Sequence, residues 1–165
     1  MNKNAAVVFS ILLVFVVSLS YGQVPGVITV EGAVRTPLKL SLLDLKTFAQ
    51  TQTNAKDKDG KEHLFKGVRL VDILDSAGVS LGKQLRGDNL AKSVLIKALD
   101  SYQVIFALPE IDPEFTNQTI LIAYEVDGKL PPEGEGPFRL IVPNDKKHAR
   151  WIRQVASIKI LFTKD

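Results

Sequence analysis

The chain has no cysteine among its 165 residues. It therefore forms no disulfide and offers no thiol nucleophile, no cysteine ligand for zinc and no site for an iron–sulfur cluster. An exported protein without disulfides must be stabilised by its packed core. The same absence removes every thiolate ligand for a transition metal, which narrows the metal chemistry open to this chain.

Other side chains with recognisable chemistry are scarce. The two histidines, His63 and His148, are far apart in sequence and have no carboxylate at metal-ligand spacing. The sequence therefore does not predict a zinc site. The G-x-G-x-x-G, P-loop and G-x-S-x-G patterns are also absent, which removes the signatures of dinucleotide binding, of phosphate-loop NTPases and of a hydrolase nucleophile elbow.

Neither sign of charge dominates the composition. Lys and Arg total 21 against 18 Asp and Glu, which gives a formal net charge of +3. Without the first 22 residues, which include Lys3, the totals are 20 and 18, so the net charge is 20 − 18 = +2. Because most basic residues are matched by acidic ones, the composition predicts no nucleic-acid partner.

Long apolar runs are confined to the N-terminus. Residues 5–19 are almost entirely apolar, Lys3 precedes them, and the tripeptide S-Y-G places small residues before Gln23. This pattern predicts a signal peptide over residues 1–22 and a periplasmic or secreted protein. The run is short for a membrane span. An uncleaved N-terminal anchor is the alternative, and it would be the chain's only contact with a membrane.

Two short helices are predicted in the first half of the chain. Ser41 and Asp44 have the S-x-x-D spacing of a capping box, so a helix begins there. Further on, V-R-L-V-D-I-L-D-S-A-G-V places apolar residues on one helical face, and Gly78 suits the C-terminal end of that helix.

The remainder of residues 23–165 has the pattern of β structure. Asp59-Gly60 and Asp127-Gly128 predict tight turns between strands. We therefore expect one domain over 23–165, of the α+β class, β-rich, with mainly antiparallel or mixed strands and a few short helices. The predicted strands and hairpins are 27–34, 51–67, 93–99, 101–108, 119–126, 137–143 and 155–162.

A basic cluster follows the strand predicted at 137–143. Cationic side chains that surround the only tryptophan suit a flat, anionic ligand. A solvated basic loop with the tryptophan in the core is the alternative. The candidate binding residues are Arg139, Lys147, His148, Arg150 and Trp151.

Arg139 differs from the others because it lies within the predicted strand, between apolar neighbours. A guanidinium is costly to bury without a partner. Arg139 therefore either lines the wall of a pocket or forms an internal ion pair, with Glu125 or Asp127 as the expected partners.

Four segments together resemble a known family. GPFRLIVPNDKKHARWIRQVASIKI is similar to the C-terminal half of the molybdopterin-binding domain of the sulfite oxidase family, with its G…P…R…P strand, basic loop and R-W step. FKGVRLVDILDSAGV, DSYQVIFAL and ILIAYEVDGKLPP resemble upstream motifs of that family and occur in the family order. The resemblance covers most of residues 26–162.

The resemblance implies a β-rich α+β fold that holds a pterin with a phosphate tail. It places four cationic residues around the pterin and its phosphate, with the tryptophan as a packing or stacking neighbour. The residues that the resemblance assigns to this cofactor site are Arg139, Lys147, His148, Arg150 and Trp151.

One departure from the family concerns the metal. Catalytic members bind molybdenum through a cysteine in the segment that TQTNAKDKDGKEH resembles, and this chain has none. We therefore expect a bound pterin or molybdopterin without protein-ligated molybdenum. The leading hypothesis is an exported, non-catalytic pterin-binding protein that senses or carries a pterin or regulates a partner in the cell envelope. The alternatives are a molybdenum cofactor-dependent oxidoreductase, with the metal held by the pterin alone, and a scaffold that has lost its ligand.

Overall fold

The computed structural model describes residues 26–163. The predicted signal peptide, residues 1–22, lies outside that range. Within the described residues, none of the helices has the length and apolar character needed to cross a membrane.

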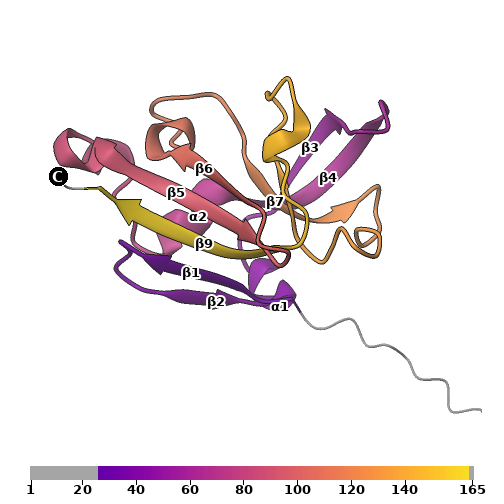
Figure 1. Cartoon of the computed structure of the whole chain (residues 1–165), viewed down its shortest axis with the longest axis horizontal. Coiled ribbons are helices and arrows are strands. Elements are labelled where there is room, and N and C mark those ends of the chain that lie inside the picture. Colours follow the sequence, from indigo (N-terminus) through magenta and orange to yellow (C-terminus); the bar gives the residue numbers. More distant parts are fainter. Residues whose placement is uncertain (1–25, 164–165) are drawn as a thin grey trace, which may run out of the picture.

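Two β-sheets form the framework of the structure (Figure 1). The five strands of the first sheet are β1 (Ile28–Gly32), β2 (Leu38–Leu40), β5 (Lys92–Ala98), β6 (Gln103–Ala107) and β9 (Val155–Phe162). Their order is β2-β1-β9-β5-β6, and all neighbours are antiparallel except the parallel pair β1 and β9.

The second sheet has four strands and is antiparallel throughout. Its strands are β3 (Thr51–Lys56), β4 (Glu62–Arg69), β7 (Leu121–Val126) and β8 (Arg139–Ile141), in the order β3-β4-β7-β8. The helices are short: α1 (Leu42–Leu45), α2 (Leu70–Ser76) and the 3₁₀ turns η1 (Gly82–Gln84), η2 (Gly87–Ala91), η3 (Leu108–Glu110) and η4 (His148–Arg150). The predicted β-rich α+β class is confirmed.

Both predicted helix boundaries are confirmed. Ser41 caps α1: its Oγ accepts a hydrogen bond from the Asp44 N–H at 3.3 Å, and the Asp44 carboxylate accepts the Ser41 N–H at 2.8 Å. These reciprocal bonds satisfy two N–H groups that the first helical turn cannot. Gly78 follows α2 with a φ of +72°, a left-handed conformation that favours glycine.

Gly67, in the motif FKGVRLVDILDSAGV, allows two strands to approach closely. It lies at the irregular point of the β4–β7 pairing. A Cβ atom at this position would lie 2.0 Å from the Ile122 carbonyl oxygen. Any larger residue would push β4 and β7 apart, so the motif requires glycine here for steric reasons.

The buried apolar side chains form one cluster that draws on both sheets and on α2. Ile96 and Ile158 contribute from the first sheet, Phe65 and Ile122 from the second, and Ile73 from α2; each is fully buried. Burying such a side chain contributes about 1.5–3 kcal/mol, so this core supplies most of the favourable free energy of folding.

The strand predicted at 137–143 is shorter in the structure, because only Arg139–Ile141 pair with β7. Its other edge is bonded to the chain that leads into β9. The Leu140 N–H donates to the Ile152 carbonyl at 2.7 Å, and the Val155 N–H donates to the Phe138 carbonyl at 2.9 Å. The loop between β8 and β9 is therefore tied to both sheets.

Candidate functional site

The loop 143–154 is held between two hairpins. On one side the Tyr102 hydroxyl, after the β5–β6 turn, donates to the Ala149 carbonyl at 2.7 Å. On the other side His148 Nε2 lies 2.7 Å from the carbonyl oxygen of Lys56, at the end of β3, and donates a hydrogen bond to it. Segments distant in the sequence thus meet around η4.

Trp151 anchors this loop in the core. It is only 5% exposed, and its indole N–H donates to the Val142 carbonyl at 2.9 Å. Its ring meets Phe65 edge-on at 5.7 Å between centroids and His148 edge-on at 4.6 Å. Trp151 is therefore a packing residue of the site in this structure.

The guanidinium of Arg139 forms two internal ion pairs, one with each of its terminal nitrogens. It is 3% exposed. One terminal nitrogen lies 2.9 Å from Asp57 Oδ2, the other lies 2.9 Å from Glu135 Oε2, and the guanidinium carbon lies 5.4 Å from the Phe65 ring centroid. Its Nε is buried and has no partner among the described residues.

The partners expected for Arg139 from the sequence were wrong. Glu125 instead lies 3.9 Å from Lys66, and Asp127 lies 2.6 Å from His63. Both acidic residues lie closer to β8 in sequence than Asp57 does, but their side chains pair with residues of β4. The actual partner Asp57 comes from the β3–β4 turn, and no local sequence pattern links that turn to β8.

Asp57 is held ionised by this arrangement. Partial burial alone would raise the pKa of its carboxyl group, but hydrogen bonds from the Lys58 N–H at 2.7 Å and from Arg139 outweigh burial and lower the pKa. Glu135 is also shared, because Arg153 lies 2.9 Å from its second oxygen. The four groups form one chain of alternating charge beneath the loop.

Arg150 is likewise engaged with carboxylates. Its Nε and one terminal nitrogen donate to Asp145 at 2.8 and 2.7 Å, and the other terminal nitrogen donates to Glu110 at 2.9 Å. Its guanidinium carbon lies 4.3 Å from the Phe106 ring centroid. These hydrogen bonds, led by those to Asp145, raise the pKa of Arg150 further above its usual value. In this structure Arg150 joins η4 to η3.

Two open hollows flank His148. The first, called here the Asp100 hollow, has a volume of about 410 Å³ and includes Lys58, Asp100, Tyr102, His148, Trp151 and Arg153 in its wall. The second, called here the Asp145 hollow, has a volume of about 450 Å³ and includes Lys56, Asp57, Lys58, Asp145, Lys146 and His148. Each falls in the size range of small-molecule sites.

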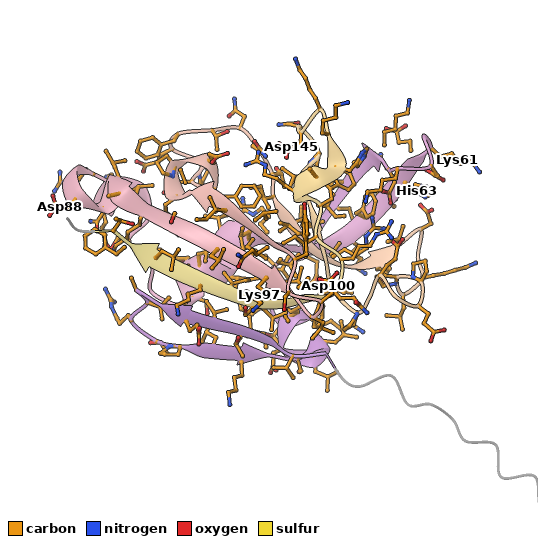
Figure 2. The ribbon with its side chains drawn as sticks, viewed as in Figure 1. Lys61, His63, Asp88, Lys97, Asp100 and Asp145 are labelled. Carbon is orange, nitrogen blue, oxygen red and sulfur yellow. The ribbon has the colours of Figure 1, made fainter. Side chains whose placement is uncertain are left out.

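Figure 2 shows Asp100 and Asp145, after which the two hollows are named. Asp100 lies at the β5–β6 turn, and Asp145 lies well apart from it on the loop after β8. Lys58, His148 and Trp151 belong to both walls. These three residues therefore form the partition between the hollows.

The unpaired cations of the hollows are lysines. Asp57 and Asp145 already pair with buried or half-buried arginines. Among the described residues, no carboxylate lies within ion-pair distance of Lys56, Lys58 or Lys146, and all three are exposed. Ammonium groups without a carboxylate partner are available to bind an anion.

The structure brings together some of the residues predicted from the sequence and separates others. His148 and Trp151 line both hollows. Arg139 and Arg150 are in the wall of neither hollow and are engaged in ion pairs. Lys147 is exposed and is not part of either wall.

Sequence reasoning missed Lys56, Lys58 and Tyr102 as residues of the hollows. Lys56 and Lys58 come from T-Q-T-N-A-K-D-K-D-G-K-E-H, the segment compared with the cysteine-bearing part of the family, and Tyr102 comes from the segment D-S-Y-Q-V. The resemblance of those two segments to family motifs was the available signal for these residues. The contact of the segments with the loop 143–154 depends on tertiary structure and could not be read from the sequence.

The donor set fits one part of a molybdopterin cofactor and not the other. Lysine ammonium groups, the tyrosine hydroxyl and an imidazole suit a phosphate and the polar edge of a pterin. No thiolate can bind a metal, because the chain has no cysteine. Among residues 26–163, no three His, Asp or Glu side chains converge in a way that could hold a metal ion.

Comparisons with known proteins agree with this architecture. Among solved structures, the chain is similar to the sulfane dehydrogenase SoxCD from Paracoccus pantotrophus, with 19% sequence identity and a TM-score of 0.66. The likeness covers 84% of this chain and 38% of that chain, so this chain spans well under half of its length. At this identity the likeness shows the fold alone. No curated protein matches the chain.

The family comparison gives a broader result. The oxidoreductase molybdopterin binding domain family matches residues 53–164, which is more than half of the chain. The match includes β4, β7, β8 and the loop that carries His148 and Trp151. The chain therefore belongs to the oxidoreductase molybdopterin binding domain family, a family that binds molybdopterin.

Proposed function

We propose that this protein binds a reduced pterin or molybdopterin-like ligand without catalysing a reaction on it. It would sense or carry the pterin, or regulate a partner protein in the cell envelope. The single observation that carries the proposal is the pair of hollows at His148, where three lysines have no carboxylate partner among the described residues while Asp57 and Asp145 are engaged by arginines. A site with that charge favours an anionic ligand.

The absence of a thiolate supports the non-catalytic part of the proposal. The resemblance places the family's molybdenum-binding cysteine in the segment TQTNAKDKDGKEH, which has no cysteine in this chain. A bound molybdenum cofactor would supply oxygen-atom transfer chemistry. Here the chain's own residues would hold only the organic part of the cofactor, through its phosphate and ring.

Membership of a family of molybdopterin-dependent oxidoreductases favours one second candidate function. In that case the metal would be held by the pterin dithiolene alone. Molybdenum analysis of protein purified from its exporting host separates the two functions. About one molybdenum per chain, together with turnover of sulfite or a sulfoxide, would replace the first proposal by the second.

The experiment that tests ligand binding is mass spectrometry of whatever small molecule is gently released from the purified protein. A pterin in about equal amount to the chain supports the proposal. Protein that holds no pterin and binds none on titration would be a scaffold that has lost its ligand, and the proposal would be wrong.

The proposed location follows from the predicted signal peptide. Cleavage near Gln23 would leave the mature protein in the periplasm or outside the cell. N-terminal sequencing of the exported protein is the test: a chain that begins at Gln23 agrees with it, and one that begins at Met1 indicates an uncleaved anchor.

A further inference from the structure

We propose that one ligand spans both hollows and carries anionic groups at two separated points. This inference rests on the proposed function and specifies the class of ligand. The ligand would be a pterin that carries more than one phosphate, or a second phosphate-bearing group. A pterin with a single phosphate would not meet this description.

The first argument is size. The Asp100 hollow and the Asp145 hollow have volumes of about 410 and 450 Å³. A single pterin ring with a short side chain needs only one hollow of this size. The presence of two comparable hollows with a shared partition is explained by a longer ligand.

The second argument is the position of Lys58. Its side chain belongs to the walls of both hollows, and among the described residues no carboxylate lies within ion-pair distance of it. The backbone at this point is fixed, because the Asp57 carboxylate accepts the Lys58 N–H at 2.7 Å and also holds Arg139. A cation at the partition can therefore contact the middle of a ligand that crosses it.

The third argument is that each hollow has a cation of its own besides Lys58. Arg153 lines only the Asp100 hollow. It pairs with Glu135, which also contacts Arg139, but its side chain is 42% exposed, so a ligand in the hollow can reach its guanidinium. Lys146 lines only the Asp145 hollow and is exposed. The cations thus occur in the order Arg153, Lys58, Lys146 across the two hollows.

Two of the three acidic residues of the hollows are already engaged, Asp57 by Arg139 and Asp145 by Arg150. Asp100 keeps its negative charge, because it is held at the β5–β6 turn by the neutral backbone N–H of Tyr102 at 2.9 Å. The lysines and Arg153 outnumber this one carboxylate across the two hollows, so an extended polyanion is attracted along the row of cations.

The test compares two probes that share one ring, dihydroneopterin monophosphate and dihydroneopterin triphosphate. Both are titrated by calorimetry into the full mature chain. We expect the triphosphate to bind at least tenfold more tightly than the monophosphate. Lys58→Ala should weaken both probes.

Variants at the two ends identify which hollow holds which part of the ligand. One of Lys146→Ala and Arg153→Ala should weaken both probes, and the other should weaken only the triphosphate, by about five- to tenfold. Lys61→Ala is the matched control, because it removes the same charge from the same turn but lines neither hollow. Melting curves confirm that each variant is folded.

The outcomes are distinguishable. If both probes bind but one end variant affects neither of them, the ligand occupies a single hollow and this inference is wrong while the proposed function stands. If Lys61→Ala weakens the triphosphate as much as the end variants, the preference reflects overall charge and the inference is also wrong. If neither probe binds the parent protein, the proposed function itself fails.

Discussion

The guanidinium of Arg139 on β8 meets the carboxylate of Asp57 in the β3–β4 turn at 2.9 Å, across 82 residues of sequence. This pair fixes the turn that carries Lys58 against the strand that precedes the basic loop. Its side chains are 4% and 14% exposed, so it lies in a region where ion pairs are little screened by solvent.

Replacing Arg139 should destabilise the fold. Arg139→Met leaves Asp57 buried without its cation and leaves Glu135 with only Arg153. Removing one partner of a buried pair costs about 3–5 kcal/mol, and we expect a loss near the lower end, because Asp57 keeps the hydrogen bond from Lys58. Urea unfolding measures the loss, with the exposed Lys39→Ala as control; an unchanged midpoint for Arg139→Met would contradict the role assigned to this pair.

Arg150→Ala should also lower stability, although Arg150 lies in a loop. The truncation removes hydrogen bonds to Asp145 and Glu110 and the stacking on Phe106. Because Arg150 is 30% exposed, we expect a loss of only about 1–2 kcal/mol. Lys147→Ala is the control. Lys147 is exposed and directly precedes η4, so this variant should melt like the parent. Equal melting temperatures for the two variants would argue against this role of Arg150.

Gly67→Ala should destabilise the β4–β7 pairing, because the added methyl group would lie 2.0 Å from the Ile122 carbonyl oxygen. Overpacking of this kind typically costs about 1–3 kcal/mol. Thermal unfolding of the variant measures the change. A melting temperature equal to that of the parent would mean that β4 can shift without cost.

His63 should make stability depend on pH. Its hydrogen bonds, first to Asp127 at 2.6 Å and then to Asp59 at 3.1 Å, raise the pKa of its imidazole. Both ring nitrogens face carboxylates, and only the protonated ring can donate to both. The contribution is therefore complete below the unfolded pKa of about 6.5 and is lost as the pH rises through the higher folded pKa.

Melting curves at several pH values test this expectation. The parent should lose melting temperature relative to His63→Asn as the pH rises above about 6.5, because only the parent has the protonated contacts to lose. Figure 2 shows His63 with Lys61 on the β3–β4 hairpin, and Lys61→Ala should keep the pH dependence of the parent. Parallel curves for the parent and His63→Asn would contradict the assignment.

Much of the fold could be predicted from the sequence because its signals are local. The capping box at Ser41, the glycine after α2 at Gly78 and the turn at Asp127-Gly128 each depend on neighbouring residues, and the structure contains all three. Asp127 and Gly128 both have positive φ, at 50° and 76°, as the predicted tight turn requires.

The candidate site was less predictable because it depends on tertiary contacts. The sequence indicated the basic loop and His148, but it could not indicate that Asp145 and Glu110 engage Arg150 or that Lys58 approaches from another hairpin. Charge counted along the loop overstates the charge available to a ligand, since Arg150 contacts two carboxylates and Arg153 pairs with Glu135. The cations without a carboxylate partner among the described residues are lysines from separate segments.

The most direct test of a pterin site at the two hollows is calorimetric titration of dihydroneopterin monophosphate into the parent protein, Lys58→Ala and Lys61→Ala. We predict that the parent and Lys61→Ala bind the probe with equal affinity and that Lys58→Ala binds it roughly three- to tenfold more weakly, as expected for loss of one charge-assisted contact in a partly hydrated site. Equal affinity for all three proteins, with unchanged melting curves, would show that the hollows at Lys58 do not form the pterin site.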